Sequence, residues 1–412
     1  MRAVVRGLSP AKWFVCKILG TLTPRVYVSA VGGLRLERRP VPQLPGDDWV
    51  LCKTRLGGIC GTDLSIVFLR QHPATILQRF VSLPVMLGHE NVAEIEATGP
   101  KVAEFRRGDR VVVDPPLACR ARGIDPVCPA CAAGRPSICE NFDAGKLPAT
   151  LGLGYNNFTG GSWSEYFVAH VSQLYRLPDG LSDERAIFID PLACSLHAIL
   201  VDLPGAGERI LVFGAGIIGL STVALLRALA IRSKVTLTAR YPHQVELGRC
   251  LGADHVVLWT GDRARSFEEL ARITGSRARP GRFGIRFLQG GFDRVYDCSG
   301  SMAGFADAAR LLRPRGTLVV VGTPQLGISD VTPVWFRELK VLGVTGRAVQ
   351  KFPGETQPEH NYMHVLRLLE QNRLDVDAFA LRLYRLPQFR DALLDLRGRG
   401  KTGVIKAAFD FR

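Results

Sequence analysis

Four cysteines crowd into one short loop in the first half of the chain. They are Cys119, Cys128, Cys131 and Cys139, set among prolines and glycines. Four thiolates with no vacant position form the closed tetrahedral site of a structural zinc ion. The other six of the ten cysteines are scattered, unlike the framework of a small disulfide-bonded secreted protein. The loop therefore predicts a structural zinc site. The alternative is an incidental cluster in which one thiol lies too far away to bind.

A second group of potential ligands comes earlier in the chain. Cys60 lies in a glycine-rich turn at residues 57–63, and His89 and Glu90 are adjacent. Sulfur, imidazole and carboxylate together are the ligands of an open, catalytic zinc site. Asp63 can accept a hydrogen bond from the other ring nitrogen of His89 and so fix the orientation of the ring. The alternative is that Cys60 is a small buried residue and His89 a hydrogen-bonded core histidine.

Three glycines follow an apolar run at residues 210–213. Gly214, Gly216 and Gly219 have the spacing G-x-G-x-x-G, and an alanine- and leucine-rich helical pattern continues to about Leu229. In this context the first glycine permits a tight turn and the second lets backbone amides approach a pyrophosphate. The third lets the helix pack closely on the strand. The motif predicts a dinucleotide-binding site, and the alternative is a buried strand–helix turn without a ligand.

The composition is that of an ordinary globular protein, except for its charge. The chain has 412 residues, 47% hydrophobic and 22% charged, which is enough for two or three domains. It has no apolar run of about 18 residues and no signal-peptide pattern, so we expect a cytoplasmic protein without a membrane partner. The net charge is +15, but the basic residues form no known nucleic-acid-binding motif, and we expect no nucleic acid partner.

The elements around these motifs are expected to be a β-rich N-terminal region followed by alternating strands and helices. Residues 1–50 contain short segments such as Arg25–Val31, which the pattern predicts to be strands and turns. The arginine-rich stretch 261–290 is expected to be a solvated, partly flexible connection. Further expected strands are Trp49–Leu56, Lys234–Thr238, Asp293–Ser299, Thr317–Gly322, Leu381–Tyr384 and Val404–Phe411, and Tyr362–Asn372 is an expected amphipathic helix.

In this order the motifs resemble those of the zinc-dependent medium-chain dehydrogenase/reductase family, which includes alcohol, polyol and threonine dehydrogenases. The resemblance spans nearly the whole chain. It rests on residues 58–63, 88–90, the four-cysteine loop, 160–166, 190–193 and 214–219. It implies an α/β fold with a GroES-like, β-rich catalytic domain and a Rossmann domain built on a doubly wound parallel sheet. The catalytic domain would comprise residues 1–185 and 347–412, and the dinucleotide-binding domain residues 186–346.

The resemblance also implies a set of metal ligands. Cys60, His89 and Glu90 would hold the catalytic zinc, with Asp190 in the metal's flexible shell. Asp190 stands where related sequences often have glutamate, and its side chain is one methylene shorter. The segment between residues 63 and 88 is longer than in many relatives, and we expect it to line or cover the substrate pocket.

The choice of dinucleotide depends on the end of the strand at 234–238, where the resemblance places Ala239 and Arg240. Proteins that use NAD usually have a carboxylate there, which bonds to the ribose 2′-hydroxyl. Without that carboxylate, a guanidinium can bind a 2′-phosphate. We therefore expect NADP, and the alternative is that Arg240 faces solvent and both dinucleotides are accepted. The other residues expected to lie along the cofactor are Ser299, Val321 and Thr323.

The implied reaction is the reversible interconversion of an alcohol and a carbonyl by hydride transfer to or from the nicotinamide. Zinc would act as Lewis acid and Thr62 would relay the proton. We expect two zinc ions per chain, a polyol, sugar or secondary alcohol as substrate, and a homodimer or homotetramer. Two alternatives stay open, a zinc-free NADPH-dependent reductase of the same fold and a non-catalytic dinucleotide-binding protein. Zinc content per chain distinguishes them.

Overall fold

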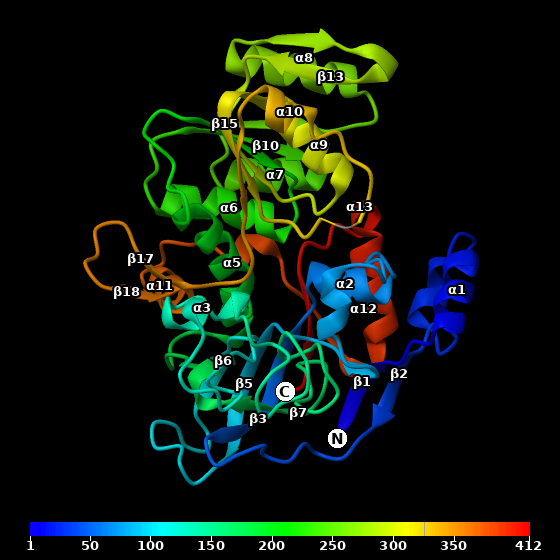
Figure 1. Ribbon diagram of the computed structural model, residues 1–412, viewed down its shortest axis with the longest axis vertical. Helices are drawn as coiled ribbons and strands as arrows, with labels where there is room; N and C mark the ends of the chain where they lie inside the picture. Colours follow the sequence, from blue (N-terminus) through cyan, green and yellow to red (C-terminus); the bar gives the residue numbers. More distant parts are fainter. Residues whose placement is uncertain (325) are drawn as a thin grey trace. The chain divides into compact units, whose positions relative to one another are not determined.

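The computed structural model describes residues 1–324 and 326–412, which form two units (Figure 1). The first unit comprises Met1–Asp190, Arg347–Val349 and Ala380–Arg412, and the second comprises Pro191–Gly346 and Gln350–Phe379. Residues 350–379 thus belong to the second unit, whereas the sequence boundary grouped them with the catalytic domain.

A largely antiparallel sheet forms the centre of the first unit. Its described strands follow the order β19-β20-β3-β5-β6-β8, and β7 pairs with β3. These strands are β3 (Trp49–Gly58), β5 (Asn91–Thr98), β6 (Arg110–Val113), β7 (Tyr166–His170), β8 (Leu174–Arg176), β19 (Arg382–Arg385) and β20 (Ala407–Asp410). Val50, Ile95, Val111 and Phe167 are fully buried and pack together in its core. The expected strands at 49–56, 381–384 and 404–411 are therefore confirmed.

Short helices lie in the connections between the strands of this sheet. They are α2 (Gly61–Val67), α3 (Pro129–Ala132), α4 (Asp183–Ala186), α12 (Phe389–Arg397) and α13 (Arg399–Thr402). Leu64 of α2 and Leu393 of α12 share one buried cluster with Trp163 and Phe409. Because Leu64 lies one helical turn from Cys60, this cluster fixes the start of α2 against the sheet.

The N-terminal residues form a small separate sheet and two helices. The described strand order is β2-β1-β4, with β1 (Arg2–Arg6), β2 (Leu34–Arg38) and β4 (Val85–Met86). Helix α1 (Pro10–Leu19) and the 3-10 helix η1 (Pro24–Val28) lie between β1 and β2 in the chain. The strand expected at Arg25–Val31 was therefore wrong. Pro24 starts η1, where its fixed φ favours a helical turn and the Thr23 side chain accepts the N–H of Arg25.

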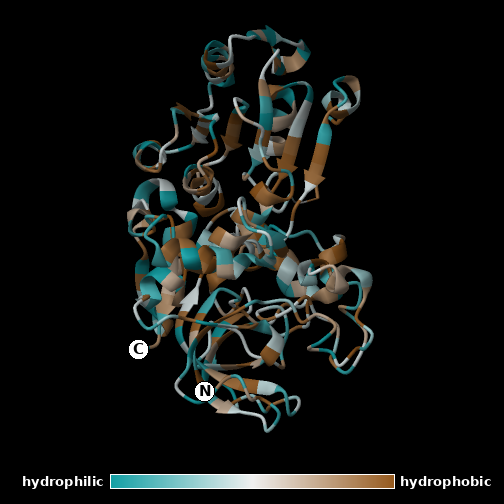
Figure 2. Cartoon of the chain, turned by 90° about the vertical axis from the view of Figure 1, so that its left-hand side faces the viewer, coloured by the Kyte–Doolittle hydropathy of each residue, from teal (hydrophilic) through white to brown (hydrophobic). Residues whose placement is uncertain are grey.

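The second unit is built on a parallel sheet, which confirms the expected Rossmann fold. The order of its described strands is β11-β10-β9-β14-β15-β16, and every pairing between neighbours is parallel. The strands are β9 (Arg209–Phe213), β10 (Lys234–Ala239), β11 (His255–Leu258), β14 (Phe292–Asp297), β15 (Leu312–Val320) and β16 (Lys340–Gly343). The central strands β9, β10 and β14 are almost wholly buried, as expected of parallel strands covered on both faces, and the strands are largely apolar (Figure 2).

Helices link the strands of this second sheet. They are α6 (Ile217–Ala228), α7 (Pro242–Cys250), α8 (Arg263–Thr274), α9 (Met302–Leu311) and α10 (Thr332–Phe336). Helix α5 (Ile189–Leu200) leads into the unit, and β17 (Val349–Lys351), β18 (Pro358–His360) and α11 (Asn361–Glu370) form its last part. The helix expected at 362–372 is thus α11. Among the helices that the structure describes, none combines the length and apolar character needed to cross a bilayer.

The expectation of a solvated connection at 261–290 was wrong. This stretch contains α8, capped by Asp262 and ended by Gly275 in the left-handed conformation, and the hairpin of β12 (Arg277–Pro280) and β13 (Arg286–Gln289). Phe267, Leu270 and Leu288 are buried against the parallel sheet's core. The arginines occupy the solvent-facing positions of these elements, so the high charge hid a regular apolar spacing.

Candidate active site and dinucleotide site

Strand register places Cys60, just after the end of β3, next to His89 and Glu90, just before the start of β5. β3 pairs antiparallel with β5, and Gly57 stands opposite Asn91. Cys60, which follows β3, therefore lies beside His89 and Glu90, which precede β5. Cys60 is the residue that caps α2, and its backbone N–H donates to Asp63 Oδ2 at 2.9 Å.

His89 is held in a buried polar contact with Asp63. The ring is 5% exposed, and its Nδ1 lies 3.6 Å from Asp63 Oδ1. Neither atom has a hydrogen-bond partner among the described residues. Burial opposes a charged imidazole, but Tyr155, Asp63 and Cys60 together raise the pKa of His89 well above its usual value. A small movement would let Nδ1–H donate to Asp63 and direct Nε2 at a metal, the arrangement that carboxylates impose on ligating histidines.

Tyr155 is a neighbour of this site that the sequence analysis did not identify. Its ring stacks on His89 with centroids 5.4 Å apart and planes 23° apart. Burial raises the pKa of Tyr155 to about 12, so its hydroxyl stays protonated. No motif marks this residue, because its contact with His89 depends on loop residues 153–160 folding back onto the sheet.

Glu90 forms a buried ion pair that the sequence did not reveal. Its carboxylate Oε2 contacts the Nζ of Lys406, and both residues are 1% exposed. Lys406 immediately precedes β20, which pairs with β3 so that Ala408 stands opposite Gly58. Burial raises the pKa of Glu90, and Lys406 opposes this rise. The Glu90 backbone is fixed as well, because its carbonyl accepts the N–H of Gly58 at 2.9 Å.

Asp190 also has a cationic partner. Its Oδ1 contacts Arg347 Nη2, and Nη1 of the same guanidinium lies 3.2 Å from Asp114 Oδ1. All three side chains are less than 10% exposed. In the described residues, Cys60, His89, Glu90 and Asp190 are not among the groups in which three ligand atoms lie within 4.8 Å of one another.

The four loop cysteines do form such a group. Their sulfur atoms all lie within 4.8 Å of one another, with Cys119 and Cys139 Sγ 3.6 Å apart. Cys119 Sγ accepts hydrogen bonds from the N–H of Cys128 at 3.3 Å and from Asn141 Nδ2 at 3.2 Å. Burial works against ionisation of Cys128, but the N–H of Glu140 and neighbouring donors lower its pKa to about 7. Burial and the neighbouring thiols instead raise the pKa of Cys131 to about 11 and raise that of Cys139 as well. The cluster thus has the four sulfur donors and the spacing that a zinc ion requires, and a bound cation would favour their thiolate forms.

The glycine motif of the second unit has the geometry of a phosphate-binding turn. Gly214 follows β9 with φ +108°, and Gly216 caps α6. A Cβ at Gly219 would lie 1.8 Å from the Gly214 carbonyl oxygen, so only glycine lets α6 pack this closely on the strand. Thr238 Oγ1 accepts the N–H of Gly214 at 2.9 Å and ties β10 to the turn. The backbone amides at the start of α6 are therefore available to an anion.

The remaining predicted cofactor residues lie at the same edge of the parallel sheet. Ser299 follows β14, and its N–H donates to Asp297 Oδ1 at 2.9 Å. Val321 and Thr323 follow β15, and the N–H of Val321 donates to the Asp297 carbonyl oxygen at 3.0 Å. These turns stand at the carboxyl ends of adjacent strands, where dinucleotides bind in doubly wound sheets.

Arg240 directly follows β10 and is exposed. Its guanidinium carbon lies 5.8 Å from the Tyr241 ring centroid, and Tyr241 stacks on His243 with planes 11° apart. The Arg240 backbone is fixed, because its N–H donates to Gln244 Oε1 at 2.9 Å. Ala239 ends β10 without a carboxylate.

Comparison with known proteins agrees with this arrangement. The family model of the alcohol dehydrogenase GroES-like domain matches residues 46–179, and that of zinc-binding dehydrogenases matches residues 218–358. The chain is 31% identical over 375 residues to an L-threonine 3-dehydrogenase of Chelativorans sp. (strain BNC1), covering 90% of this chain and 94% of that protein. It is 29% identical over 375 residues to the Rhizobium etli L-threonine 3-dehydrogenase, covering 90% and 94%.

A solved structure is similar over nearly the same length. It is a zinc-binding dehydrogenase from Sinorhizobium meliloti 1021 bound to NADP, with 26% identity, a TM-score of 0.68, and coverage of 92% of this chain and 96% of that one. Family models of one group of enzymes match both halves of the chain, and relatives from that group match along 90% of its length. The chain belongs to the zinc-dependent medium-chain dehydrogenase/reductase family and is an oxidoreductase of the alcohol dehydrogenase type.

Proposed function

We propose that this chain interconverts a secondary hydroxyl and a carbonyl by hydride transfer to or from NADP. The observation that carries the proposal is the convergence of Cys60, His89 and Asp63 at adjoining ends of β3 and β5. It occurs in a chain whose second unit has a phosphate-binding glycine turn. A thiolate and an imidazole oriented by a carboxylate are the protein ligands of a catalytic zinc that keeps one position open.

Each side chain of the first unit has a definite part in this proposal. Cys60 and His89 hold the metal, which supplies Lewis-acid chemistry to the substrate oxygen when bound. Asp63 sets the tautomer and direction of His89. The Thr62 hydroxyl, 3.8 Å from Cys60 Sγ, takes the substrate proton outward. Glu90, whose Oε2 is paired with Lys406, or Asp190 would complete the ligand set.

NADP is proposed because of the residues after β10. Ala239 supplies no carboxylate to repel a 2′-phosphate, and the exposed guanidinium of Arg240 supplies positive charge at the same place. The structure similar to this chain from Sinorhizobium meliloti was solved with NADP. The nicotinamide carries the hydride, while Gly214, Gly216 and Gly219 position the pyrophosphate and Ser299, Val321 and Thr323 border the cofactor.

Replacing Arg240 by alanine is expected to raise the Kd for NADP about tenfold to a hundredfold, because charge-assisted bonds to the 2′-phosphate are lost. The Kd for NAD should stay within about twofold, since NAD has no phosphate there. Fluorescence titration of both dinucleotides measures the two constants. Arg249→Ala is the matched control, because Arg249 is an exposed arginine near the other end of α7. Equal weakening of NADP and NAD in R240A would contradict the assignment.

The structural zinc is proposed at the four-cysteine cluster. Cys131→Ser should reduce the zinc content from two ions to one per chain and lower the free energy of unfolding by several kcal/mol, since a structural zinc contributes directly to folding. Metal analysis and thermal unfolding give the two readouts. Cys250→Ser changes an exposed cysteine outside both ligand sets and should alter neither. An unchanged zinc content in C131S would remove the cluster as a zinc site.

The reaction itself is tested with a substrate panel. Zinc-replete protein is mixed with polyols, aldoses, secondary alcohols and L-threonine, with NADP⁺ and NAD⁺ in parallel, and reduced nicotinamide is followed by absorbance. L-Threonine belongs in the panel because the curated relatives above are L-threonine 3-dehydrogenases. Turnover with one class of alcohol and NADP⁺ supports the proposal. Turnover without bound zinc would indicate a zinc-free reductase. No measurable turnover with any substrate, together with intact dinucleotide binding, would favour a non-catalytic binding protein.

A further inference from the structure

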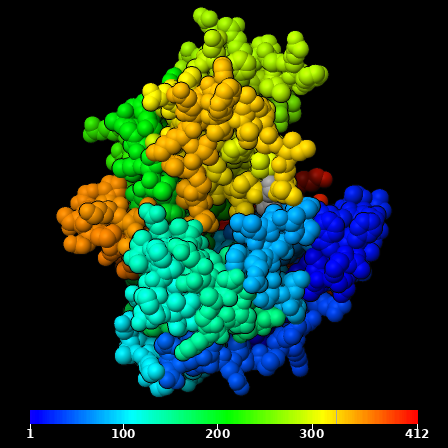
Figure 3. Space-filling model, viewed as in Figure 1, coloured from blue at the N-terminus to red at the C-terminus, as the bar shows by residue number. Residues whose placement is uncertain are grey.

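The helix α1 exposes apolar side chains over its outer surface. Cys16 is the one buried residue of this helix, while Phe14 is 61% exposed, Ile18 53% and Leu22, just after the helix, 81%. Phe14 and Ile18 lie about one helical turn apart on one face of α1, and Leu22 is in the turn that follows the helix; these three exposed residues are the apolar row of this segment. Val15 and Leu19, 41% and 38% exposed, extend the row sideways. The segment stands out from its unit in the space-filling view (Figure 3). A helix that is apolar on its buried and outer faces requires a second apolar environment.

The charged residues of α1 and of the sequence around it, up to residue 36, are all basic. The first acidic residue of the chain is Glu37. The basic residues before it are Arg2, Arg6, Lys12, Lys17, Arg25 and Arg35. Lys12 and Lys17 flank the apolar row on its two sides, and Lys17 Nζ lies 5.5 Å from the Trp13 ring centroid. Packing α1 of one copy against α1 of a second copy would place like charges together with no acidic residue of α1 to neutralise them, so this contact is disfavoured.

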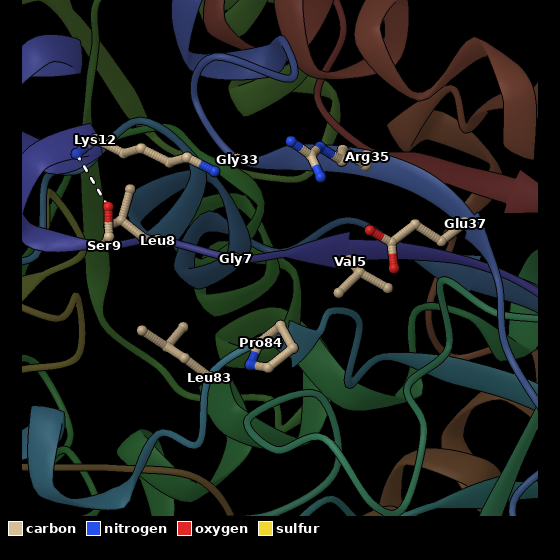
Figure 4. Close-up of a pocket in the computed structure, with 10 residues that line it drawn as sticks. All are labelled: Val5, Gly7, Leu8, Ser9, Lys12, Gly33, Arg35, Glu37, Leu83 and Pro84. Atoms are coloured by element: carbon tan, nitrogen blue, oxygen red, sulfur yellow. Dashed lines mark hydrogen bonds between the residues drawn. The ribbon is translucent and has the colours of Figure 1, made fainter.

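A groove of about 340 Å³ borders the same helix (Figure 4). Its walls include the apolar Val5, Leu8, Leu83 and Pro84. Lys12 from α1 and Arg35 from β2 extend toward each other across it (Figure 4). Neither cationic group has a hydrogen bond or ion pair with any residue in 1–324 or 326–412.

The acidic residue of the groove does not neutralise these cations. Glu37 is paired with Arg39, whose Nη2 lies 2.7 Å from Glu37 Oε2. The groove thus combines an apolar wall with two uncompensated cations. An anionic group that is attached to an apolar chain has the complementary chemistry.

We propose that α1 and this groove dock the chain on an anionic phospholipid surface. The row of Phe14, Ile18 and Leu22 enters the boundary between headgroups and acyl chains, with α1 lying parallel to the surface. Lys12 and Arg35 take a headgroup phosphate, and Lys17 stays at the interface by extending its ammonium outward. The helix is too short to span a bilayer, so the contact is peripheral and reversible. The proposal differs from the expectation, drawn from the sequence, that the chain has no membrane partner.

Vesicle co-sedimentation of the full chain tests the proposal. Vesicles of phosphatidylglycerol and phosphatidylcholine in equal amounts are expected to bind the protein, and pure phosphatidylcholine vesicles to bind it much less. Phe14→Ser/Ile18→Ser should weaken binding to the anionic vesicles about tenfold or more, because apolar area no longer enters the interface. Lys12→Glu/Arg35→Glu should abolish it, while Lys12→Arg should retain it.

The matched control is Trp335→Ser/Phe336→Ser. These exposed aromatic residues of α10 are 79% and 75% exposed and belong to the second unit. The control should bind vesicles like the original chain. If F14S/I18S binds equally well, adsorption arises from the net charge of +15 alone, and the proposal fails. If F14S/I18S instead lowers the molar mass measured by light scattering, the apolar row is an interface between protein chains and the proposal fails. The proposal also fails if the original chain binds an acidic protein through α1 but does not bind anionic vesicles.

Discussion

Cys60→Ser is expected to lower kcat about a thousandfold or more while leaving the Kd for NADP(H) unchanged. A serine hydroxyl is a far weaker zinc ligand than a thiolate, because it stays protonated and is a harder donor. Cys60 caps α2 in the first unit, whereas the glycine turn belongs to the second, so loss of the metal ligand should not alter the dinucleotide site. Steady-state kinetics and fluorescence titration of the dinucleotide measure the two quantities separately.

The control for this variant is again Cys250→Ser, which should retain full turnover. Metal analysis adds an independent readout, since C60S should keep the zinc of the four-cysteine cluster and lose the other ion. The assignment would be contradicted if the Kd for NADP(H) rose by the same factor as kcat fell. It would also be contradicted if C60S retained two zinc ions and normal turnover.

Lys406→Met is expected to destabilise the chain by about 3–5 kcal/mol, because it leaves the Glu90 carboxylate buried without its counterion. Both side chains are 1% exposed, so water cannot replace the lost cation. Glu90→Gln/Lys406→Met should recover much of this loss, since a neutral pair of similar volume has no charge to desolvate. Urea unfolding in the C60S background, which keeps the zinc of the four-cysteine cluster and lacks the other ion, provides the comparison, because no metal then compensates the Glu90 charge.

An exposed pair gives the matched control for this second prediction. Lys101 Nζ lies 3.2 Å from Asp47 Oδ2, and the two side chains are 73% and 57% exposed. Lys101→Met should change the free energy of unfolding by no more than about 0.5 kcal/mol, as exposed ion pairs contribute little. The interpretation of Glu90 and Lys406 as a buried charge pair fails if K406M is no less stable than K101M. It also fails if the double variant is no more stable than K406M.

Much of the candidate site could be predicted because its residues are grouped along the chain. The four cysteines lie in one loop, and the three glycines lie in one strand–helix turn, so local spacing alone determined which ligand each group suits. The same holds for β10 as a strand, because its sequence pattern alone predicted residues 234–238, whereas family resemblance placed Arg240 at its end. Family resemblance then indicated that Cys60 and the His89–Glu90 pair belong to one zinc site.

Local sequence patterns gave the wrong secondary structure where many charged residues separate the buried ones, or where a segment is short. The arginines at 261–290 concealed α8 and its hairpin, because the apolar positions recur only every three or four residues. The segment Arg25–Val31 buries Tyr27 and Val28, and the sequence pattern alone did not distinguish a strand from a short 3-10 helix. The exposed apolar row of α1 is likewise invisible until the fold shows which of its faces is covered.

The sequence by itself determined the two-part α/β architecture, the glycine turn and the chemical types of the candidate metal ligands. Only the tertiary structure decided the counterions of those ligands. Lys406 is 316 residues from Glu90, and Arg347 is 157 residues from Asp190. Lys406 reaches Glu90 because the register of β20 against β3 places it there. Arg347 reaches Asp190 because the chain returns to the first unit at residues 347–349. Neither ion pair can be predicted from a local sequence pattern. A buried ion pair depends on which segments become neighbours in the fold and not on the distance between residues along the chain.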